Sequence, residues 1–269
     1  MITLAFQESL VPGESLACKL HWLADNLIEG IELDGRQLAQ RIPEIQRELS
    51  RFPVKVTAIC GGYRGWLIGE DSEEQRHFLS DMRTLLESAA RLGACGVIAP
   101  AIWGTSRYLP LPARTSSLEE DRERLIEHLR ILGEYAHSLG TAVLLEPLNR
   151  YQAHYINQIT EALDIIETVE SPGVRLIADL FHMNVEEANP LASLAVAGSH
   201  LSYVHLSDSN RRLPGLGHID FGAVFRELER IGFQGPASVE ALPAESGDEL
   251  VACARFLNTL QHQTQKDGE

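Results

Sequence analysis

Basic residues are scarce in this chain of 269 residues: 23 lysines and arginines stand against 38 aspartates and glutamates, a formal net charge of −15. Proteins that bind nucleic acids rely on clustered lysine and arginine to displace counterions from the phosphates. The charge therefore argues against a nucleic-acid partner. It suits a small substrate that is neutral or is bound with the help of a cation.

Cysteines and long apolar runs are also few. The four cysteines form no Cys-x-x-Cys pair, so neither a zinc knuckle nor a redox motif is indicated, and a disulfide framework is not expected in a chain of this size. No apolar stretch approaches the ~18–20 residues that span a bilayer. The first residues lack the basic region and apolar core of a signal peptide. We therefore expect a cytoplasmic protein with no membrane partner.

Short apolar runs alternate with longer amphipathic segments along the whole chain. The runs are rich in valine, isoleucine and leucine and lack a clean apolar–polar alternation, as expected for parallel strands covered on both faces. The expected strands are Ile2–Glu8, Gly30–Asp34, Val54–Cys60, Gly96–Ile102, Thr141–Leu148, Val174–Leu180, Tyr203–Ser207 and Ala237–Ala241.

Three helices are well marked between these strands. In Leu118–Leu139 the apolar residues fall on one face, and Ser117 begins a capping-box pattern before it. Ser72 begins a similar pattern before a helix expected around Glu74–Leu92, and a third helix is expected at Phe221–Ile231. A glycine follows each of the three, where a helix commonly ends.

Eight strands that alternate with helices predict a (β/α)₈ TIM barrel. The length gives about 34 residues per strand–helix unit, a usual size for this fold. A doubly wound open sheet has the same local pattern, but the chain has no Gly-x-Gly-x-x-Gly after its first strand and no Walker-type motif. No linker or low-complexity tract divides the chain. We therefore predict an α/β fold with a single barrel domain over residues 1–269.

Four polar residues stand at or near the ends of the last four expected strands: Glu146, Asp179, His205 and Glu240. They are separated by 33, 26 and 35 residues, each close to one strand–helix unit. In a barrel, this spacing brings the side chains together at the carboxyl ends of the strands, where active sites of this fold lie. Any one of them alone is expected to be a strand-end residue bonded to a loop. Four at unit spacing argue for a site.

Three carboxylates and one imidazole require a compensating charge, because like charges held close together are costly at low dielectric. A divalent cation would supply that charge. Carboxylate-rich ligands with one histidine and no thiolate favour Mn²⁺, Mg²⁺ or Co²⁺ over a structural zinc site.

The residues around these positions carry a family resemblance. The segments Glu146–Tyr151, Asp179–Glu187, His205–Arg212 and Pro214–Phe221 resemble signature stretches of the xylose-isomerase-like TIM-barrel sugar isomerase/epimerase family. Within that family they are most similar to the ketose 3-epimerases, of which D-tagatose 3-epimerase is the type. The resemblance is specific between Glu146 and Glu240 and only topological in the first part of the chain.

The resemblance implies a metal-dependent epimerisation of a free ketose, most simply at C3. One metal ion, usually Mn²⁺ with Co²⁺ or Mg²⁺ as alternatives, would be bound by Glu146, Asp179, His205 and Glu240. The metal would hold the carbonyl and a neighbouring hydroxyl and stabilise an enediolate. Glu146 and Glu240 would be catalytic on opposite faces of the sugar, one removing the proton and the other returning it. The resemblance also suggests a homodimer or homotetramer.

Further residues are expected to contact the substrate. By resemblance, His182 and Arg211 would bind sugar oxygens. The 3-epimerases usually have a second glutamate where this chain has Gln152, which brings no charge and no base, so the choice of sugar is open. Phe6 and Trp103, near the ends of the first and fourth strands, are either apolar walls of the pocket or ordinary packing residues.

Several alternatives stay open from the sequence. The same scaffold and two glutamates serve aldose–ketose isomerases, including hydroxypyruvate isomerase, and the scaffold is also used to dehydrate keto-inositols. An endonuclease-IV-like DNA repair enzyme would need a three-zinc cluster with further histidines, where this chain has Asp34 and Cys60. An inactive scaffold barrel is disfavoured, because none of the expected ligands is replaced.

Overall fold

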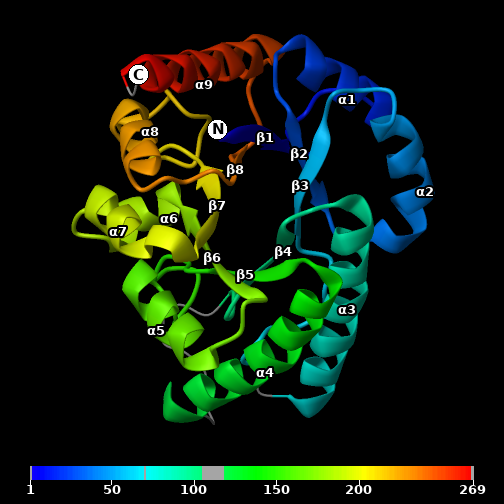
Figure 1. The fold of residues 1–269 in the computed structure, drawn as a ribbon, viewed down its shortest axis with the longest axis vertical. Helices are drawn as coiled ribbons and strands as arrows, with labels where there is room; N and C mark the ends of the chain where they lie inside the picture. The colour runs from blue at the N-terminus through cyan, green and yellow to red at the C-terminus, as the bar shows by residue number, and fades with distance from the viewer. Residues whose placement is uncertain (1, 70, 105–117, 268–269) are drawn as a thin grey trace.

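Eight parallel strands close a barrel in the computed structural model, which describes residues 2–69, 71–104 and 118–267. Each strand pairs with the next in the chain, and β8 pairs with β1 to close the ring. The helices surround the strands (Figure 1). The predicted (β/α)₈ barrel is confirmed, and the doubly wound open sheet is excluded.

Each of the eight predicted strands is present, with ends that differ by at most a few residues. The strands are β1 Thr3–Gln7, β2 Gly30–Asp34, β3 Lys55–Cys60, β4 Gly96–Pro100, β5 Ala142–Glu146, β6 Val174–Asp179, β7 Leu201–Leu206 and β8 Pro236–Val239.

The helices follow the strands and form the outer layer. They are α1 Leu16–Asp25, α2 Leu38–Leu49, α3 Ser72–Leu92, α4 Leu118–Leu139, α5 Ile159–Val169, α6 Leu180–Glu186, α7 Pro190–Ala197, α8 Phe221–Arg230 and α9 Gly247–Asp267. No helix in the described residues is long and apolar enough to cross a membrane.

The helix predictions were correct in position and partly wrong in capping. The helix α4 has the predicted bounds, while its expected capping residue Ser117 lies outside the described residues. The cap of α3 lies one residue earlier than expected, because the helix begins at Ser72 itself: Asp71 accepts hydrogen bonds from the backbone N–H groups of Glu73 and Glu74. Aspartate suits this position because its carboxylate also faces the positive end of the helix dipole.

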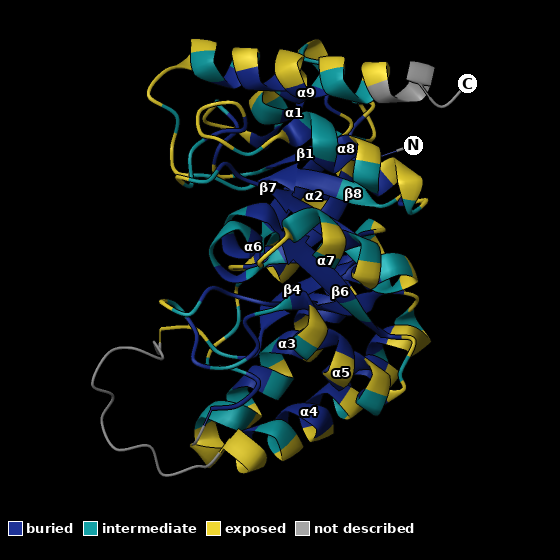
Figure 2. Cartoon of the chain, turned by 90° about the vertical axis from the view of Figure 1, so that its left-hand side faces the viewer, coloured by how far each residue is buried: buried dark blue, intermediate teal, exposed yellow. Residues whose placement is uncertain are grey.

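The core has two layers, because successive side chains of a strand point to opposite faces. Residues on the outer faces of the strands pack against the helices, whereas a smaller cluster that includes Ala142, Leu144 and Tyr203 fills the barrel interior. Figure 2 shows the strands buried and the helices exposed on their outer sides. On β5, Ala142 and Leu144 face inward, and the same alternation turns Glu146 toward the barrel axis.

Phe6 belongs to the outer layer of the core. Of its two possible roles, ordinary packing is therefore confirmed and a place in the wall of the pocket is wrong. Its side chain is fully buried, and its ring packs edge-on against Trp22 of α1, with ring centroids 5.7 Å apart. The inward position on β1 is taken by the next residue, Gln7, whose amide contacts Glu32 of β2.

Candidate metal centre

The four predicted ligands converge at the carboxyl ends of β5 to β8. Glu146 and Asp179 are the last residues of β5 and β6, His205 is the last residue but one of β7, and Glu240 directly follows β8. Each offers one ligand atom, and these atoms all lie within 4.8 Å of one another. We call this group the carboxylate–histidine cluster. In the described part of the chain, no other group of three or more His, Cys, Asp or Glu side chains is close enough to share a metal ion.

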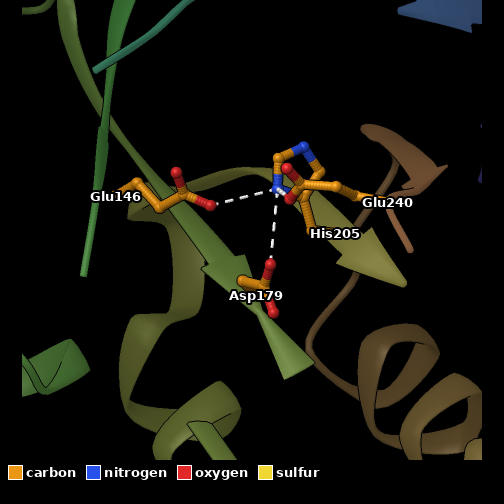
Figure 3. Close-up of side chains that lie close together, drawn as sticks. All are labelled: Glu146, Asp179, His205 and Glu240. Atoms are coloured by element: carbon orange, nitrogen blue, oxygen red, sulfur yellow. Dashed lines mark hydrogen bonds and ion pairs between the residues drawn. The ribbon is translucent and has the colours of Figure 1, made fainter. Parts of the chain in front are cut away.

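His205 stands at the centre of the cluster (Figure 3). Its Nδ1 atom lies 3.0 Å from Glu146 Oε1, 3.6 Å from Asp179 Oδ2 and 2.7 Å from Glu240 Oε2. Glu146 and Glu240 reach the imidazole from opposite sides. One nitrogen atom therefore faces all three carboxylates, which is the arrangement expected when these four groups share one cation.

Burial and charge push the pKa values of the carboxyl groups apart. Burial raises the pKa of Glu146 to about 7. Burial acts in the same direction on Glu240, but the positive charges of His205 and Arg211 outweigh it and lower its pKa to about 2. For Asp179 burial is likewise outweighed, chiefly by Arg211 and then by His182, and its pKa falls well below the ordinary value.

The pKa of His205 shifts as a consequence of its carboxylate neighbours. Burial alone would lower it, but the negative charges of Glu240 and Glu32 raise it well above the ordinary value. A cluster that draws a proton so strongly onto its central imidazole is an environment that favours a cation.

One oxygen of the cluster is not satisfied by hydrogen bonds. Glu240 Oε2 is buried, with His205 Nδ1 and Arg211 Nη2 each 2.7 Å away, yet it makes no hydrogen bond of acceptable geometry among the described residues. Its charge is compensated by these two groups, but its unused lone pairs make it a suitable ligand atom for a cation. Together with the oxygen-rich donor set, this observation shows that the residues present fit a divalent cation of the Mn²⁺ or Mg²⁺ kind.

Arg211 closes one side of the cluster. Its guanidinium donates to Asp179 Oδ2 at 2.6 Å, lies 2.7 Å from Glu240 Oε2 and stacks over the ring of Phe181, 5.0 Å from the centroid. The residue has a left-handed backbone with φ of 61°. The buried Asp208 fixes this loop, because its backbone carbonyl accepts from the Arg211 N–H at 2.8 Å.

His182 lies on the first turn of α6, which Asp179 caps through its side chain. Its Nδ1 atom accepts hydrogen bonds from the Asn149 backbone N–H at 3.1 Å and side-chain amide at 2.8 Å. The ring proton is thereby assigned to Nε2, which lies 4.0 Å from Asp179 Oδ2. The structure thus places a buried imidazole N–H donor beside the cluster. Asn149 was not singled out from the sequence.

Gln152 and Trp103 lie in loops at the same end of the barrel and are not members of the cluster. The Gln152 carbonyl accepts from the Gly104 backbone N–H at 2.8 Å, which ties the loop after β5 to the segment after β4. Trp103 is 53% exposed and lies beside Trp66, with ring centroids 6.1 Å apart. Substrate contact by either residue stays a prediction.

Glu32 supports the site from β2 and was not among the residues predicted from the sequence. Its carboxylate lies 3.0 Å from His205 Nε2 and is fully buried. The one signal available was a charged residue between Ile31 and Leu33, in the middle of a buried strand, where charge is rare.

The fold and the cluster define a (β/α)₈ barrel protein with a group of four side chains that could hold a cation at the carboxyl ends of its strands. The chain belongs to the xylose isomerase-like TIM barrel family, whose model matches residues 20–259. The resemblance inferred from the signature segments is therefore confirmed.

Two curated relatives show the breadth of the family. The chain is 38% identical over 225 residues to 3-dehydro-D-guloside 4-epimerase of Escherichia coli K12, an alignment that covers 82% of this chain and 85% of the relative. It is 34% identical over 182 residues to D-psicose 3-epimerase of Enterocloster bolteae, covering 67% of this chain and 59% of the relative. These relatives support the prediction of a carbohydrate epimerase or isomerase.

Solved structures agree with this. The apo form of 3-keto-D-glucoside 4-epimerase from Escherichia coli matches with a TM-score of 0.91 and 32% identity, covering 97% of this chain and all of that one. A D-psicose 3-epimerase with D-tagatose from Clostridium cellulolyticum has a TM-score of 0.85 at 19% identity and is similar in fold.

Proposed function

We propose that this protein is a metal-dependent epimerase that inverts a carbon next to the carbonyl of a keto sugar. The observation that carries the proposal is the placement of Glu146 and Glu240, which reach the centre of the cluster from opposite sides (Figure 3). Inversion needs one group to remove a proton on one face and a second group to return a proton on the other. A single carboxylate would return the proton to the face from which it came.

Different side chains of the protein carry out the steps of the proposed reaction. One glutamate, ionised, takes the proton from the carbon, the C–H electrons form the C=C bond of an enediolate, and the carbonyl π electrons move onto the oxygen. The other glutamate, protonated beforehand, then donates its proton to the opposite face of the carbon while the carbonyl reforms. The Nε2–H of His182 and the guanidinium of Arg211 donate hydrogen bonds to sugar oxygens, and the Gln152 amide contacts the far end of the sugar. A divalent cation at the cluster would polarise the carbonyl and stabilise negative charge on its oxygen.

Two substrates fit this chemistry. The signature segments predict C3 of a free ketose. The other candidate is C4 of a 3-keto-glycoside, where the inverted carbon is again adjacent to the carbonyl. It is favoured by the identity of 38% to the 3-dehydro-D-guloside 4-epimerase, of which the chain covers 85%, against 59% of the D-psicose 3-epimerase. The presence of Gln152 where the 3-epimerases usually have a glutamate points the same way. We therefore rank the 3-keto-glycoside first.

We also propose Mn²⁺ as the preferred metal, with Co²⁺ and Mg²⁺ as substitutes, because the donor set is three carboxylates and one imidazole. All four cysteines are free, which supports a cytoplasmic location. A homodimer or homotetramer is proposed on the family resemblance.

Deuterium incorporation in D₂O, followed by NMR with the Mn²⁺-loaded protein, tests the function. Deuterium at C4 of a 3-keto-glycoside with inversion would establish a 4-epimerase of 3-keto-glycosides. Deuterium at C3 of a free ketose with inversion would establish a ketose 3-epimerase. Label at C1 or C2 with formation of an aldose would replace the proposal with an isomerase, and loss of water would replace it with a dehydratase. No exchange with any keto sugar of either class would contradict it.

A further inference from the structure

Glu32 of β2 is a buried carboxylate held by three donors inside the barrel. Its Oε1 atom accepts from the Gln7 amide at 2.8 Å. Its Oε2 atom accepts from the Tyr203 hydroxyl at 2.9 Å and lies 3.0 Å from His205 Nε2. Only 1% of Glu32 is exposed. The donors fix the carboxylate in position and leave it little freedom to rotate.

The two nitrogen atoms of His205 face different partners. Nδ1 faces the three carboxylates of the cluster, while Nε2 faces Glu32 from across the barrel. A cation ligated by Nδ1 uses the lone pair of that nitrogen, so the proton of the neutral ring must lie on Nε2. Glu32 Oε2 is placed to accept that proton's hydrogen bond.

Stability alone does not account for a carboxylate at this position. Removing an ionised group from water is expensive, and a buried charged network is often no more stable than apolar side chains of similar volume. The neighbouring interior residues Ala58, Ile98 and Ile177 show that this barrel packs apolar side chains in its lumen. A glutamate at this position is therefore explained better by its contact with His205 than by a contribution to stability.

We infer that Glu32 is a positioning residue for the metal centre: it holds His205 with its proton on Nε2 and its Nδ1 lone pair directed at the cation. Tyr203 and Gln7 in turn hold Glu32. The inference rests on the proposed function only through the cation site, and it does not depend on which sugar is turned over.

The test measures Mn²⁺ affinity by calorimetry on the full-length chain. Glu32→Ala should weaken Mn²⁺ binding by about 10–100-fold, the usual effect of losing a partner that orients a ligand. Glu32→Gln keeps the shape and a neutral acceptor, so it should recover part of that loss. The matched control is Thr57→Val, which removes another buried hydrogen bond to Tyr203, with an oxygen–oxygen distance of 2.8 Å, without touching His205. It should bind Mn²⁺ with nearly wild-type affinity.

A second readout separates positioning from packing. In ¹⁵N-histidine spectra of the Mg²⁺-loaded protein, wild type and Glu32→Gln should show an Nε2–H of His205 that is hydrogen-bonded and exchanges slowly with water. In Glu32→Ala the same proton should lose its hydrogen-bonded chemical shift and exchange faster. Wild-type Mn²⁺ affinity together with an unchanged Nε2–H signal in Glu32→Ala would overturn the inference. If Glu32→Ala does not fold, Glu32→Gln decides, and an affinity equal to that of Thr57→Val would overturn it. A wild type that binds Mn²⁺ but epimerises nothing refutes the proposed function and leaves this inference standing.

Discussion

The two halves of the barrel contribute differently to the candidate metal centre. The strands β5 to β8 end in the carboxylate–histidine cluster, whose ligand atoms lie within 4.8 Å of one another. The strands β1 to β3 supply none of these atoms. They contribute Gln7 of β1 and Glu32 of β2, which form a hydrogen-bonded network with Tyr203 and His205 of β7. The strands β5 to β8 thus supply the expected metal ligands. The strands β1 and β2 supply side chains that hydrogen-bond to one another and, through Glu32, to His205.

The two halves of the barrel differ most clearly at two aspartates, each of which is the last residue of its strand. Asp179 ends β6, is fully buried and faces His205, His182 and Arg211. Asp34 ends β2, is partly exposed and pairs with Arg36, two residues further along. The same residue type at the same place in a strand–helix unit therefore has two uses. The neighbours brought by adjacent strands decide which.

The largest effect is expected in the half that carries the cluster. Replacing Glu240 with glutamine should lower kcat by about 10²–10⁴-fold, because it removes a group that exchanges a proton with the substrate. It should also weaken Mn²⁺ binding, since an anionic ligand is lost. Glu245→Gln is the matched control: this carboxylate is exposed and pairs with Arg212 at 2.9 Å. Near-normal turnover by Glu240→Gln would remove Glu240 from the mechanism.

Arg211→Lys should produce the next largest effect. A lysine has a single ammonium group, which cannot hydrogen-bond Asp179 and lie against Glu240 at the same time as the guanidinium does, so kcat/KM should fall about 10–100-fold. Steady-state kinetics with the identified substrate measures this. The neighbour Arg212, which forms ion pairs with Glu245 and Glu249, provides the control Arg212→Lys. Equal activity of the two variants would show that Arg211 has no special role.

Much of this architecture could be predicted from the sequence, because it depends on local patterns. Short apolar runs separated by amphipathic segments predicted all eight strands. The regular spacing of polar residues after the runs predicted the cluster, because one strand–helix unit returns the chain to the same end of the barrel.

The supporting network could not be predicted in this way. Glu32 and His205 are 173 residues apart in the chain, and nothing local shows that β2 and β7 face each other across the lumen. Asn149 and His182, which are also in contact, are 33 positions apart in the chain. Phe6 was open to two interpretations because its position, inward or outward, depends on the register of β1 in the closed barrel.

A smaller effect is expected at the loop between β5 and α5. Gln152→Glu adds a charge and removes a donor, and one hydrogen bond to a charged group changes binding by about 1.5–3 kcal/mol. The ratio of kcat/KM for a free ketose to that for a 3-keto-glycoside should therefore rise by about 10-fold or more. Competition between the two substrates, followed by NMR, measures the ratio. An unchanged ratio would mean that residue 152 does not face the sugar.

The smallest effect is expected at Asp34 of β2, the strand-end aspartate that was compared with Asp179 of β6. Asp34→Asn removes an exposed ion pair with Arg36, which contributes at most about 1 kcal/mol to stability. Mn²⁺ affinity, measured by calorimetry, should stay at the wild-type value. A loss of affinity as large as that of Asp179→Asn would show that the first half of the barrel supplies a ligand after all.

The most direct test of the difference between the two halves is anomalous diffraction from crystals of the Mn²⁺-loaded protein. We predict one anomalous peak, ligated by Glu146, Asp179 and Glu240 and by His205 through Nδ1, with Glu32 hydrogen-bonded to Nε2 behind it. A peak ligated by Glu32 or Asp34, or no peak within the carboxylate–histidine cluster, would contradict the account.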